Sequence, residues 1–314
     1  MTFRPWDVAW HDALYGPAGF YRRPEGPAGH FRTASHAAPG PLGAALARLA
    51  RSTGCDQVVD VGAGRGELLT AVHSADGSLA LLGVDVVPRP SGLPPAIAWA
   101  DQAPDAMPRT LLVGWELLDN VPCPVLAVDG ERVRVVEVDD DGRERVGGPA
   151  EPHDLAWCHR WWPGAAGERI EVGRPRDELW ASLVDRVTDG VALAVDYGHL
   201  AGARPASGTL TGYRAGRQVP PVPDGSCDIT AHVALDALGG RLLTQYQALR
   251  LLGIQAQRPL PSSDVAAYLA GLAAASEAAE LLDPGGLGGF GWVLHPRGGA
   301  ASRLLEEWTH GAPS

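Results

Sequence analysis

The chain has 314 residues, 45% of them hydrophobic, which suits one large domain with an elaboration or two modest domains. Its formal charge of -11 at pH 7 argues against a surface for nucleic acid or anionic membranes, because both need clustered cations. All 26 basic side chains are arginines, so the chain has neither a Schiff-base lysine nor a P-loop lysine.

The cysteines and the N-terminal sequence indicate the cellular compartment. The four cysteines lie far apart in the sequence, at Cys55, Cys123, Cys158 and Cys227. We therefore expect neither a disulfide framework nor a metal site, and a reducing cytoplasm fits best. The stretch MTFRPWDVAWHDALYG has no charged segment followed by an apolar one, and no run reaches 18 uninterrupted apolar residues, so neither secretion nor membrane insertion is expected.

Two helices are predicted before the first strand. Apolar residues at Trp6, Ala9, Ala13 and Leu14 have helical spacing, and an extended loop follows to residue 40. PLGAALARLA, residues 41–50, is also helical in its spacing, with a proline suited to a first turn.

A series of buried strands comes next. Near-continuous apolar runs predict strands at residues 57–62, 79–87, 96–101, 110–116 and 190–198, with a helix at 66–75 between the first two. Such runs are typical of a parallel sheet that is covered on both faces. The predicted fold is an α/β domain with a Rossmann-like, doubly wound, mostly parallel sheet.

The other segments are less regular. Residues 122–189 hold short β-like pieces and a Trp-rich loop, LAWCHRWWPG, and we interpret them as partly an insertion. That loop's tryptophans could form a substrate platform or a partner contact, but a small satellite core is favoured. Helical patterns follow at 229–238 and 263–282, and a final strand is predicted within residues 288–298.

A glycine loop carries the first functional signal. Gly62, Gly64 and Gly66 lie between a predicted strand and a predicted helix in VVDVGAGRGELL, where backbone can approach a ligand at the helix N-terminus. A dinucleotide fingerprint would need GxGxxG, but position 67 is Glu67, whose carboxylate would repel a pyrophosphate. The loop therefore favours a cofactor without phosphates.

S-adenosyl-L-methionine is such a cofactor, because it joins a cationic amino acid and a sulfonium to a ribose diol and an adenine. We expect Asp60 to accept from its ammonium, Asp85 to hold its ribose hydroxyls and Asp101 to accept from its adenine amine. All three acids would lie at the carboxyl edge of the sheet, where ligands of open α/β sheets bind. Alternatively, the glycines only allow tight packing, and the acids are helix N-caps.

Motifs along nearly the whole chain resemble those of the MidA-like family, whose mitochondrial member is a protein-arginine methyltransferase needed to assemble respiratory complex I. They are ALYGPAGFY (13–21), GHFRTA (29–34), VVDVGAGRGELL (58–69), WELLDNVP (115–122), VDYG (195–198), GTLTGY (208–213), PDGSCDITAHV (223–233) and LLDPGGLGGFGWVL (281–294). The resemblance implies a class I methyltransferase fold with S-adenosyl-L-methionine as cofactor. It also places Phe31 and Thr33 among the cofactor-binding residues.

Three positions depart from the family's motifs. His30 stands in place of an aspartate, Trp115 in place of an asparagine and Gly216 in place of a histidine. None of them lies in the glycine loop, so cofactor binding is better supported than acceptor choice or turnover.

The resemblance implies a protein arginine as the methyl acceptor. Methyl transfer is an in-line displacement, so the enzyme mainly positions donor and acceptor. Glu116 and Asp119 are predicted to form a carboxylate fork that orients the guanidinium and receives a proton. Alternatively, Glu116 caps a turn and Asp119 starts a helix. Asp196, Tyr197 and Asp228 are lesser candidates for substrate contacts, with a structural role for Tyr197 and an N-cap role for Asp228 as alternatives.

The domain prediction follows from these assignments. Residues 1–50 would cover the cofactor site, residues 51–200 would form the cofactor-binding domain with its partial insertion at 122–189, and residues 201–314 would complete the sheet and the acceptor side.

The main hypothesis is a cytoplasmic methyltransferase that acts on an arginine of a protein, which the resemblance implies to be a respiratory-complex subunit. Nucleic acid and membrane are not expected as partners, and a homodimer stays open. One alternative is a catalytically degenerate assembly or scaffold protein that binds the cofactor, which Trp115 favours. Another is a small-molecule methyltransferase, which would be expected to show a closed acceptor pocket.

Overall fold

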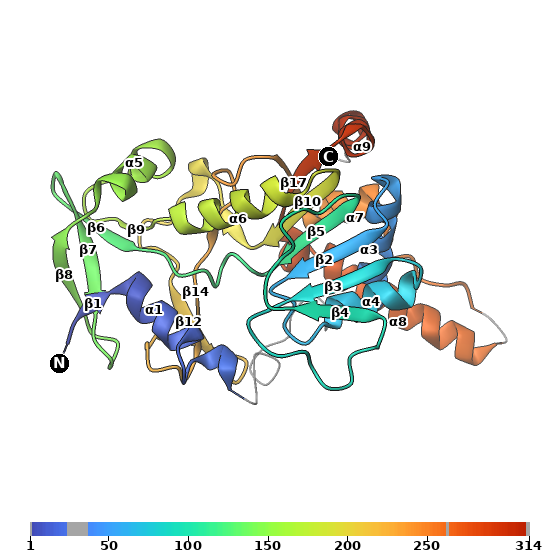
Figure 1. Cartoon of the computed structure of the whole chain (residues 1–314), viewed down its shortest axis with the longest axis horizontal. Helices are drawn as coiled ribbons and strands as arrows, with labels where there is room; N and C mark the ends of the chain where they lie inside the picture. The colour runs from blue at the N-terminus through green and yellow to red at the C-terminus, as the bar shows by residue number, and fades with distance from the viewer. Residues whose placement is uncertain (1, 24–36, 262–263, 312–314) are drawn as a thin grey trace. The chain divides into compact units, whose positions relative to one another are not determined.

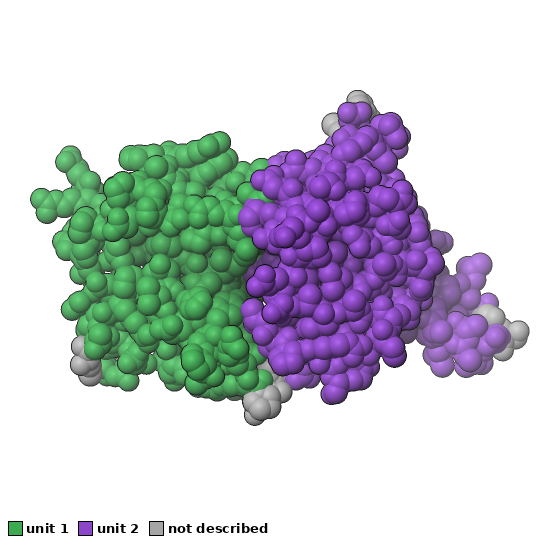
Figure 2. Space-filling model, viewed as in Figure 1, with its two compact units in different colours: residues 1–32, 118–181, 196–239 green, residues 33–117, 182–195, 240–314 purple. Residues whose placement is uncertain are grey.

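The computed structural model describes residues 2–23, 37–261 and 264–311 and divides into two compact units (Figure 2). Unit 1 comprises Met1–Arg32, Leu118–Ala181 and Asp196–Gly239, and unit 2 comprises Thr33–Leu117, Ser182–Val195 and Gly240–Ser314. Each unit is thus assembled from three separate stretches of chain. The boundaries predicted at residues 50 and 200 do not coincide with these units.

Unit 2 is built on a seven-stranded sheet in the order β16-β17-β10-β5-β2-β3-β4 (Figure 1). Its strands are β2 (Gln57–Val61), β3 (Ala80–Val84), β4 (Ile97–Ala100), β5 (Thr110–Trp115), β10 (Gly190–Asp196), β16 (Arg241–Thr244) and β17 (Gly291–Arg297). The pairs from β10 to β4 are parallel, and β16 pairs antiparallel with β17. The predicted strands, including the final one, are therefore confirmed.

The helices of unit 2 are α3 (Pro39–Ser52), α4 (Glu67–Ala75), α7 (Gln245–Leu251), α8 (Val265–Leu282) and α9 (Gly299–Gly311), with a 3-10 turn, η4 (Leu287–Gly289). Every residue of β5 is buried, and its alternate side chains Leu111, Val113 and Trp115 pack in one core with residues of α3, α8 and α9. The helices predicted at 41–50, 66–75 and 263–282 are confirmed as α3, α4 and α8.

Helix α8 is the one helix among the described residues that is long and apolar enough to cross a bilayer, with a mean hydropathy of 1.4. Only 22% of it is buried. A single helix of this kind is weak evidence for a membrane segment, because helices of soluble proteins meet the same criteria.

The described residues of unit 1 form three smaller sheets. The largest is antiparallel, in the order β1-β7-β6-β9 with β8 on β7, and consists of β1 (Arg4–Pro5), β6 (Val125–Asp129), β7 (Arg132–Val138), β8 (Glu144–Pro149) and β9 (Arg169–Glu171). The others are the antiparallel set β12 (Thr211–Arg214), β13 (Arg217–Val219) and β14 (Asp228–Thr230), and the parallel pair β11 (Gly198–His199) and β15 (Val233–Ala234). Its helices are α1 (Trp6–Tyr15), η1 (Phe20–Arg22), α5 (Pro152–Trp161), η3 (Ala201–Ala203) and α6 (Arg174–Arg186), which continues into unit 2.

Two predictions in unit 1 are wrong. The helix predicted at 229–238 is absent, because Asp228–Thr230 pairs with β12 and Val233–Ala234 pairs with β11. Short apolar runs do not distinguish a strand from a helix, and here pairing with distant strands decides. The Trp-rich segment is not a loop but contains α5, and Trp157 and Trp162 are buried in a satellite core with residues of β6 and β9, as favoured.

Gly216 has a local structural explanation. The strands β12 and β13 are joined by a two-residue turn at Ala215 and Gly216, whose φ angles are 49° and 73°. Hairpin turns of this type need positive φ at both central positions, and glycine is favoured there. The absence of the family's histidine therefore fits the turn.

The close packing of α3 on α4 gives a stability test. A Cβ on Gly43 would lie 2.3 Å from the Ala71 carbonyl oxygen, whereas a Cβ on Gly40 in the same helix meets only the Glu277 side chain, at 3.4 Å. We expect Gly43→Ala to lower the free energy of unfolding by about 1–3 kcal/mol, because backbone atoms must move apart. Gly40→Ala should change it by less than about 0.5 kcal/mol. Urea denaturation would measure both, and equal effects would contradict this packing.

Candidate functional site

The glycine loop between β2 and α4 is packed at both ends and open in the middle. The φ angles of Gly62, Gly64 and Gly66 are 77°, 58° and 78°, which L side chains rarely adopt. A Cβ on Gly62 would lie 2.8 Å from Leu117 Cδ1, and a Cβ on Gly66 would lie 2.5 Å from Leu93 Cδ1. The nearest atom to a Cβ on Gly64 would be 3.9 Å away. A ligand can therefore approach the loop backbone at Gly64.

Asp85, which follows β3, braces this loop. Its Oδ2 accepts a hydrogen bond from the Gly64 N–H at 2.8 Å, and its Oδ1 accepts from the Val87 N–H at 3.1 Å. Burial raises its pKa, while these two bonds act in the opposite direction. Each carboxylate oxygen keeps a further lone pair, so the predicted contact with a ribose diol is compatible with both bonds.

The four adjacent parallel strands β5, β2, β3 and β4 each have a carboxylate at or near the carboxyl end. These are Glu116, Asp60, Asp85 and Asp101. The structure thus brings the predicted cofactor acids to one edge of the sheet, as parallel pairing requires. Asp101 is exposed, and Asp60 is only 3% exposed. Burial, followed by the charges of Asp85 and Glu67, raises the pKa of Asp60 well above its usual range.

Two of the predicted cofactor-binding residues lie outside the part of the chain that the structure describes, and the sequence analysis did not name one residue at this edge of the sheet. Phe31 and Thr33, and also His30, lie outside the described residues. Val86 was not predicted, although it is 52% exposed directly after Asp85 and offers an apolar surface beside it. The sequence could have indicated Val86, because it is an apolar residue that directly follows an acid at the end of a strand.

Within the described part of the chain, no group of three or more His, Cys, Asp or Glu could hold a metal.

Glu116 follows β5 in a strained conformation. Its N–H donates to the Val195 carbonyl oxygen at 2.8 Å, but its φ angle is 49°. A non-glycine residue in this region costs about 1 kcal/mol or more, and such residues cluster at functional sites. The next residue, Leu117, is the one that limits the space at Gly62. Glu116 is therefore held beside the glycine loop within unit 2.

Trp115 lies in the hydrophobic core of unit 2. It is 8% exposed, and its ring meets Trp292 edge to face with centroids 5.7 Å apart. The Trp292 Nε1–H in turn donates to Gln245 Oε1 at 3.3 Å. The tryptophan that replaces the family's asparagine thus packs in the core.

Asp196 and Asp119 belong to unit 1, where their carboxylates connect segments that are far apart in the sequence. Asp196 Oδ2 accepts from the N–H groups of Leu118 and Asp119 at 3.0 and 3.2 Å. Asp119 Oδ2 accepts from the Tyr197 hydroxyl at 2.5 Å and from Thr230 Oγ1 at 2.7 Å. The hydroxyls of Tyr197 and Thr230 also contact each other. The alternative that Asp119 starts a helix is wrong, because it lies in a turn.

Burial is the largest influence on the acids of this network. It raises the pKa of Asp119, although both hydroxyl bonds and the charge of Arg176 lower it. Burial and the charge of Asp119 also raise the pKa of Tyr197. The hydrogen bonds of Tyr197 to Asp119 and Thr230 agree with the alternative that Tyr197 has a structural role and does not contact the substrate.

Asp228 is a buried acid of unit 1 that accepts hydrogen bonds from two side chains. It accepts from the Tyr21 hydroxyl at 3.0 Å and from Asn120 Nδ2 at 3.2 and 3.4 Å. Burial, and next the charge of Asp119, raises its pKa to about 8. The N-cap alternative is wrong, because Asp228 begins strand β14.

The raised pKa of Asp228 predicts a pH-dependent stability. Between the ordinary pKa of 3.8 and about 8 the folded state keeps a proton that the unfolded chain has released, so stability falls as pH rises through this window. In Asp228→Asn this contribution is absent, and the loss of stability between pH 5 and pH 8 should become smaller. Urea denaturation at both values would measure it, with Asp129→Asn at an exposed position as control. Identical pH profiles for Asp228→Asn and the native protein would refute the shift.

Comparisons with known proteins identify the family and the fold of the chain. A family model described as "Putative S-adenosyl-L-methionine-dependent methyltransferase" matches residues 85–255, more than half of the chain. A COG1565 superfamily member from Burkholderia thailandensis, solved with bound S-adenosyl-homocysteine, has a TM-score of 0.77 and 24% identity over 95% of this chain and 90% of that one. A second COG1565 superfamily structure from the same organism has a TM-score of 0.76 and 23% identity over the same shares. No curated protein matches the chain.

The two structures show an α/β methyltransferase fold for this chain. The family match begins at Asp85, the acid that braces the glycine loop, and extends through β5, Glu116 and β14. The chain therefore belongs to this family of S-adenosyl-L-methionine-dependent methyltransferases, with S-adenosyl-L-methionine as its cofactor.

Proposed function

We propose that this methyltransferase transfers the methyl group of its cofactor to an arginine side chain of a protein. The observation that carries the proposal is the carboxylate of Glu116, which a strained backbone presents at the end of β5, directly before the residue that touches the glycine loop. A planar guanidinium pairs with a carboxylate through two parallel hydrogen bonds. Glu116 would therefore orient the acceptor.

In this proposal, different residues of unit 2 bind the cofactor and the acceptor. When bound, the cofactor supplies an electrophilic methyl group. Glu116 would hold the guanidinium and take up the proton that its nitrogen loses as the new bond forms. Asp60 would balance the ammonium of the cofactor, Asp85 would hold its ribose and Asp101 its adenine amine. Val86 offers an apolar surface beside Asp85 for a flat base.

The predicted fork is thereby reduced to one carboxylate. Asp119 is buried, and its Oδ2 is taken up by Tyr197 and Thr230. Asp196 and Asp228 are likewise engaged by backbone or side-chain donors of unit 1. We therefore assign the acceptor contact to Glu116, and to these three acids the task of shaping unit 1.

The wider proposal follows the family resemblance. The proposed acceptor is a respiratory-complex subunit, and the proposed location is the cytoplasm. The scaffold alternative was favoured by Trp115, and that support weakens because this side chain packs against Trp292 in the core. The small-molecule alternative is decided by the experiments below.

Cofactor binding should depend on the open position at Gly64. We expect Gly64→Leu to weaken binding of S-adenosyl-L-methionine by about 100-fold, equivalent to about 2.8 kcal/mol, because the side chain would occupy the ligand's approach. Gly130→Leu is a matched control, since its φ of 61° is close to the 58° of Gly64 and a Cβ there meets nothing within 4 Å. Calorimetry would measure both affinities. Equal affinities in the two variants would place the cofactor elsewhere.

Glu116 should be needed for turnover but not for folding. We expect Glu116→Gln to lower kcat by roughly 100-fold or more, since an amide receives no proton and pairs poorly with a guanidinium. Glu116→Gly should lower kcat similarly while raising the free energy of unfolding by up to about 1 kcal/mol, because glycine adopts the positive φ without strain. Labelled-methyl transfer into the proteins of a cell lysate, followed by hydrolysis and detection of methylarginine, would measure activity.

Each alternative gives a different result in that assay. Label in small molecules but not in proteins would support the small-molecule alternative. Label in another amino acid would overturn the arginine assignment, and an absence of label with native protein that binds the cofactor would support the scaffold alternative. Glu131→Gln, in the exposed β6–β7 turn, should behave like the native protein.

A further inference from the structure

Trp99 lies across the strand that leads to Asp85. It is the direct partner of Gly83 where β4 pairs with β3. A Cβ on Gly83 would lie 2.4 Å from Trp99 Cζ3 and 3.3 Å from the Cβ of Ala63. The indole ring therefore occupies the space that the glycine leaves open, and it lies close to the glycine loop, to which Ala63 belongs.

The indole N–H of Trp99 holds the backbone segment that in turn holds Asp85. Trp99 Nε1 donates to the Val87 carbonyl oxygen at 3.0 Å. The N–H of Val87 donates to Asp85 Oδ1 at 3.1 Å, and Asp85 Oδ2 accepts from the Gly64 N–H at 2.8 Å. Consecutive hydrogen bonds thus connect the side chain of Trp99 to the middle of the glycine loop through both oxygens of Asp85.

The rest of the segment after β3 has anchors of its own. Arg89 donates its Nη2 to the carbonyl oxygens of Leu93 and Pro94 at 2.9 and 3.0 Å. Leu93 also packs against the glycine loop, since its Cδ1 would lie 2.5 Å from a Cβ on Gly66. Loss of the indole hydrogen bond should therefore free the peptide group of Val87 without detaching the rest of the segment.

A carboxylate that accepts from two ribose hydroxyls has to be held in one orientation. The Val87 N–H holds the Oδ1 side of Asp85, and Trp99 holds Val87. Burial raises the pKa of Asp85, whereas the bonds from Gly64 and Val87 lower it. The bond from Val87 thus both orients the carboxyl group and favours its charged form, which is the better acceptor for hydroxyls.

We infer that Trp99 is a positioning residue for the cofactor, whose indole N–H orients Asp85 toward the ribose by way of Val87. This inference rests on the proposed contact between Asp85 and the ribose. An aromatic ring over a strand glycine also stabilises a sheet by packing alone, so packing and hydrogen bonding have to be separated. Trp99→Phe separates them, because phenylalanine keeps a ring over Gly83 and has no N–H.

Calorimetry with the full chain and S-adenosyl-homocysteine tests this inference. Trp99→Phe should weaken binding roughly 3- to 10-fold, the range expected for one lost hydrogen bond. In an Asp85→Asn background Trp99→Phe should have little further effect, because both changes act on the same contact. Trp292→Phe is a matched control that should keep the native affinity, since Trp292 Nε1 donates to Gln245 in the core of unit 2.

Two further measurements distinguish positioning from a packing defect. A form of S-adenosyl-homocysteine whose ribose lacks both hydroxyls should bind equally well to the native protein and to Trp99→Phe, which would also show that the variant is folded. In labelled-methyl transfer into the proteins of a cell lysate, Trp99→Phe should raise the KM for S-adenosyl-L-methionine and leave kcat unchanged.

The outcomes separate this inference from the proposals on which it rests. Equal affinities of the native protein and Trp99→Phe, additive effects of Trp99→Phe and Asp85→Asn, or an equal loss for the ligand without hydroxyls would each overturn it. If Asp85→Asn binds S-adenosyl-homocysteine as tightly as the native protein, the ribose contact fails and this inference fails with it. The calorimetry does not involve the acceptor, so failure of the arginine proposal would leave its result unchanged.

Discussion

The hydrogen bond from the Gly64 N–H to Asp85 is the interaction on which the candidate cofactor site depends. It fixes the middle of the glycine loop to the end of β3, while the N–H groups of Gly62 and Ala63 donate to the Val84 carbonyl oxygen at 2.9 and 3.2 Å. A partly buried carboxylate without these donors would be costly. The acid assigned to the ribose is therefore also the group that shapes the loop, and the site is ordered by the fold itself.

Strain and buried charge gather at the same edge of the sheet. Glu116 has an unfavourable φ, and Asp60 is buried near Asp85 and Glu67. Proteins tolerate such local costs at functional sites when the surrounding packing is favourable. Here β5 is buried along its whole length directly before Glu116, so the strained residue follows a strand that is held firmly in the core.

The sequence predicts unit 2 apart from β16, α7 and α9, because its other strands are continuous apolar runs and its other helices have regular apolar periods. Unit 1 is predicted poorly. The strand Asp228–Thr230 has only three residues and exists through its pairing with β12, and the Asp196 carboxylate holds N–H groups 78 and 77 positions earlier in the chain. Contacts over such distances leave no local signal. The edge acids were found because parallel strands end together, whereas the φ of Glu116 has no sequence signature.

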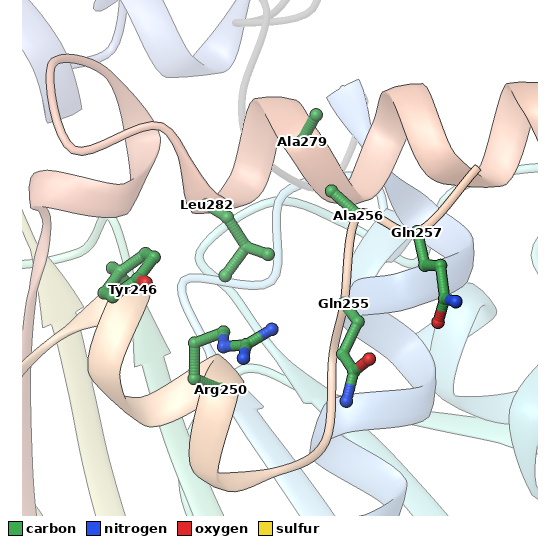
Figure 3. A pocket seen from close by; sticks show the side chains of 7 residues that line it. All are labelled: Tyr246, Arg250, Gln255, Ala256, Gln257, Ala279 and Leu282. Atoms are coloured by element: carbon green, nitrogen blue, oxygen red, sulfur yellow. The ribbon is translucent and has the colours of Figure 1, made fainter. Parts of the chain in front are cut away.

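The pocket between α7 and α8 illustrates why a cavity alone does not identify a site. It has a volume of about 640 Å³ and is lined by Tyr246, Arg250, Gln255, Ala256, Gln257, Ala279 and Leu282 (Figure 3). It has none of the edge carboxylates or loop glycines. The candidate site is recognised instead by backbone geometry and charge.

Trp115 and Glu116 are neighbours in sequence but lie in different environments. This difference explains how Trp115 can replace the asparagine of the similar MidA-like motif while the carboxylate next to it keeps its place at the sheet edge. Trp115 continues the alternation of Leu111 and Val113 into the core, where Trp292 packs against its ring. The next residue leaves the strand with a positive φ, which ends that alternation. A change at position 115 therefore alters the packing between β5 and β17, while the carboxylate at position 116 is oriented by its own backbone. For this reason an unusual residue beside the proposed acceptor carboxylate is poor evidence that activity has been lost.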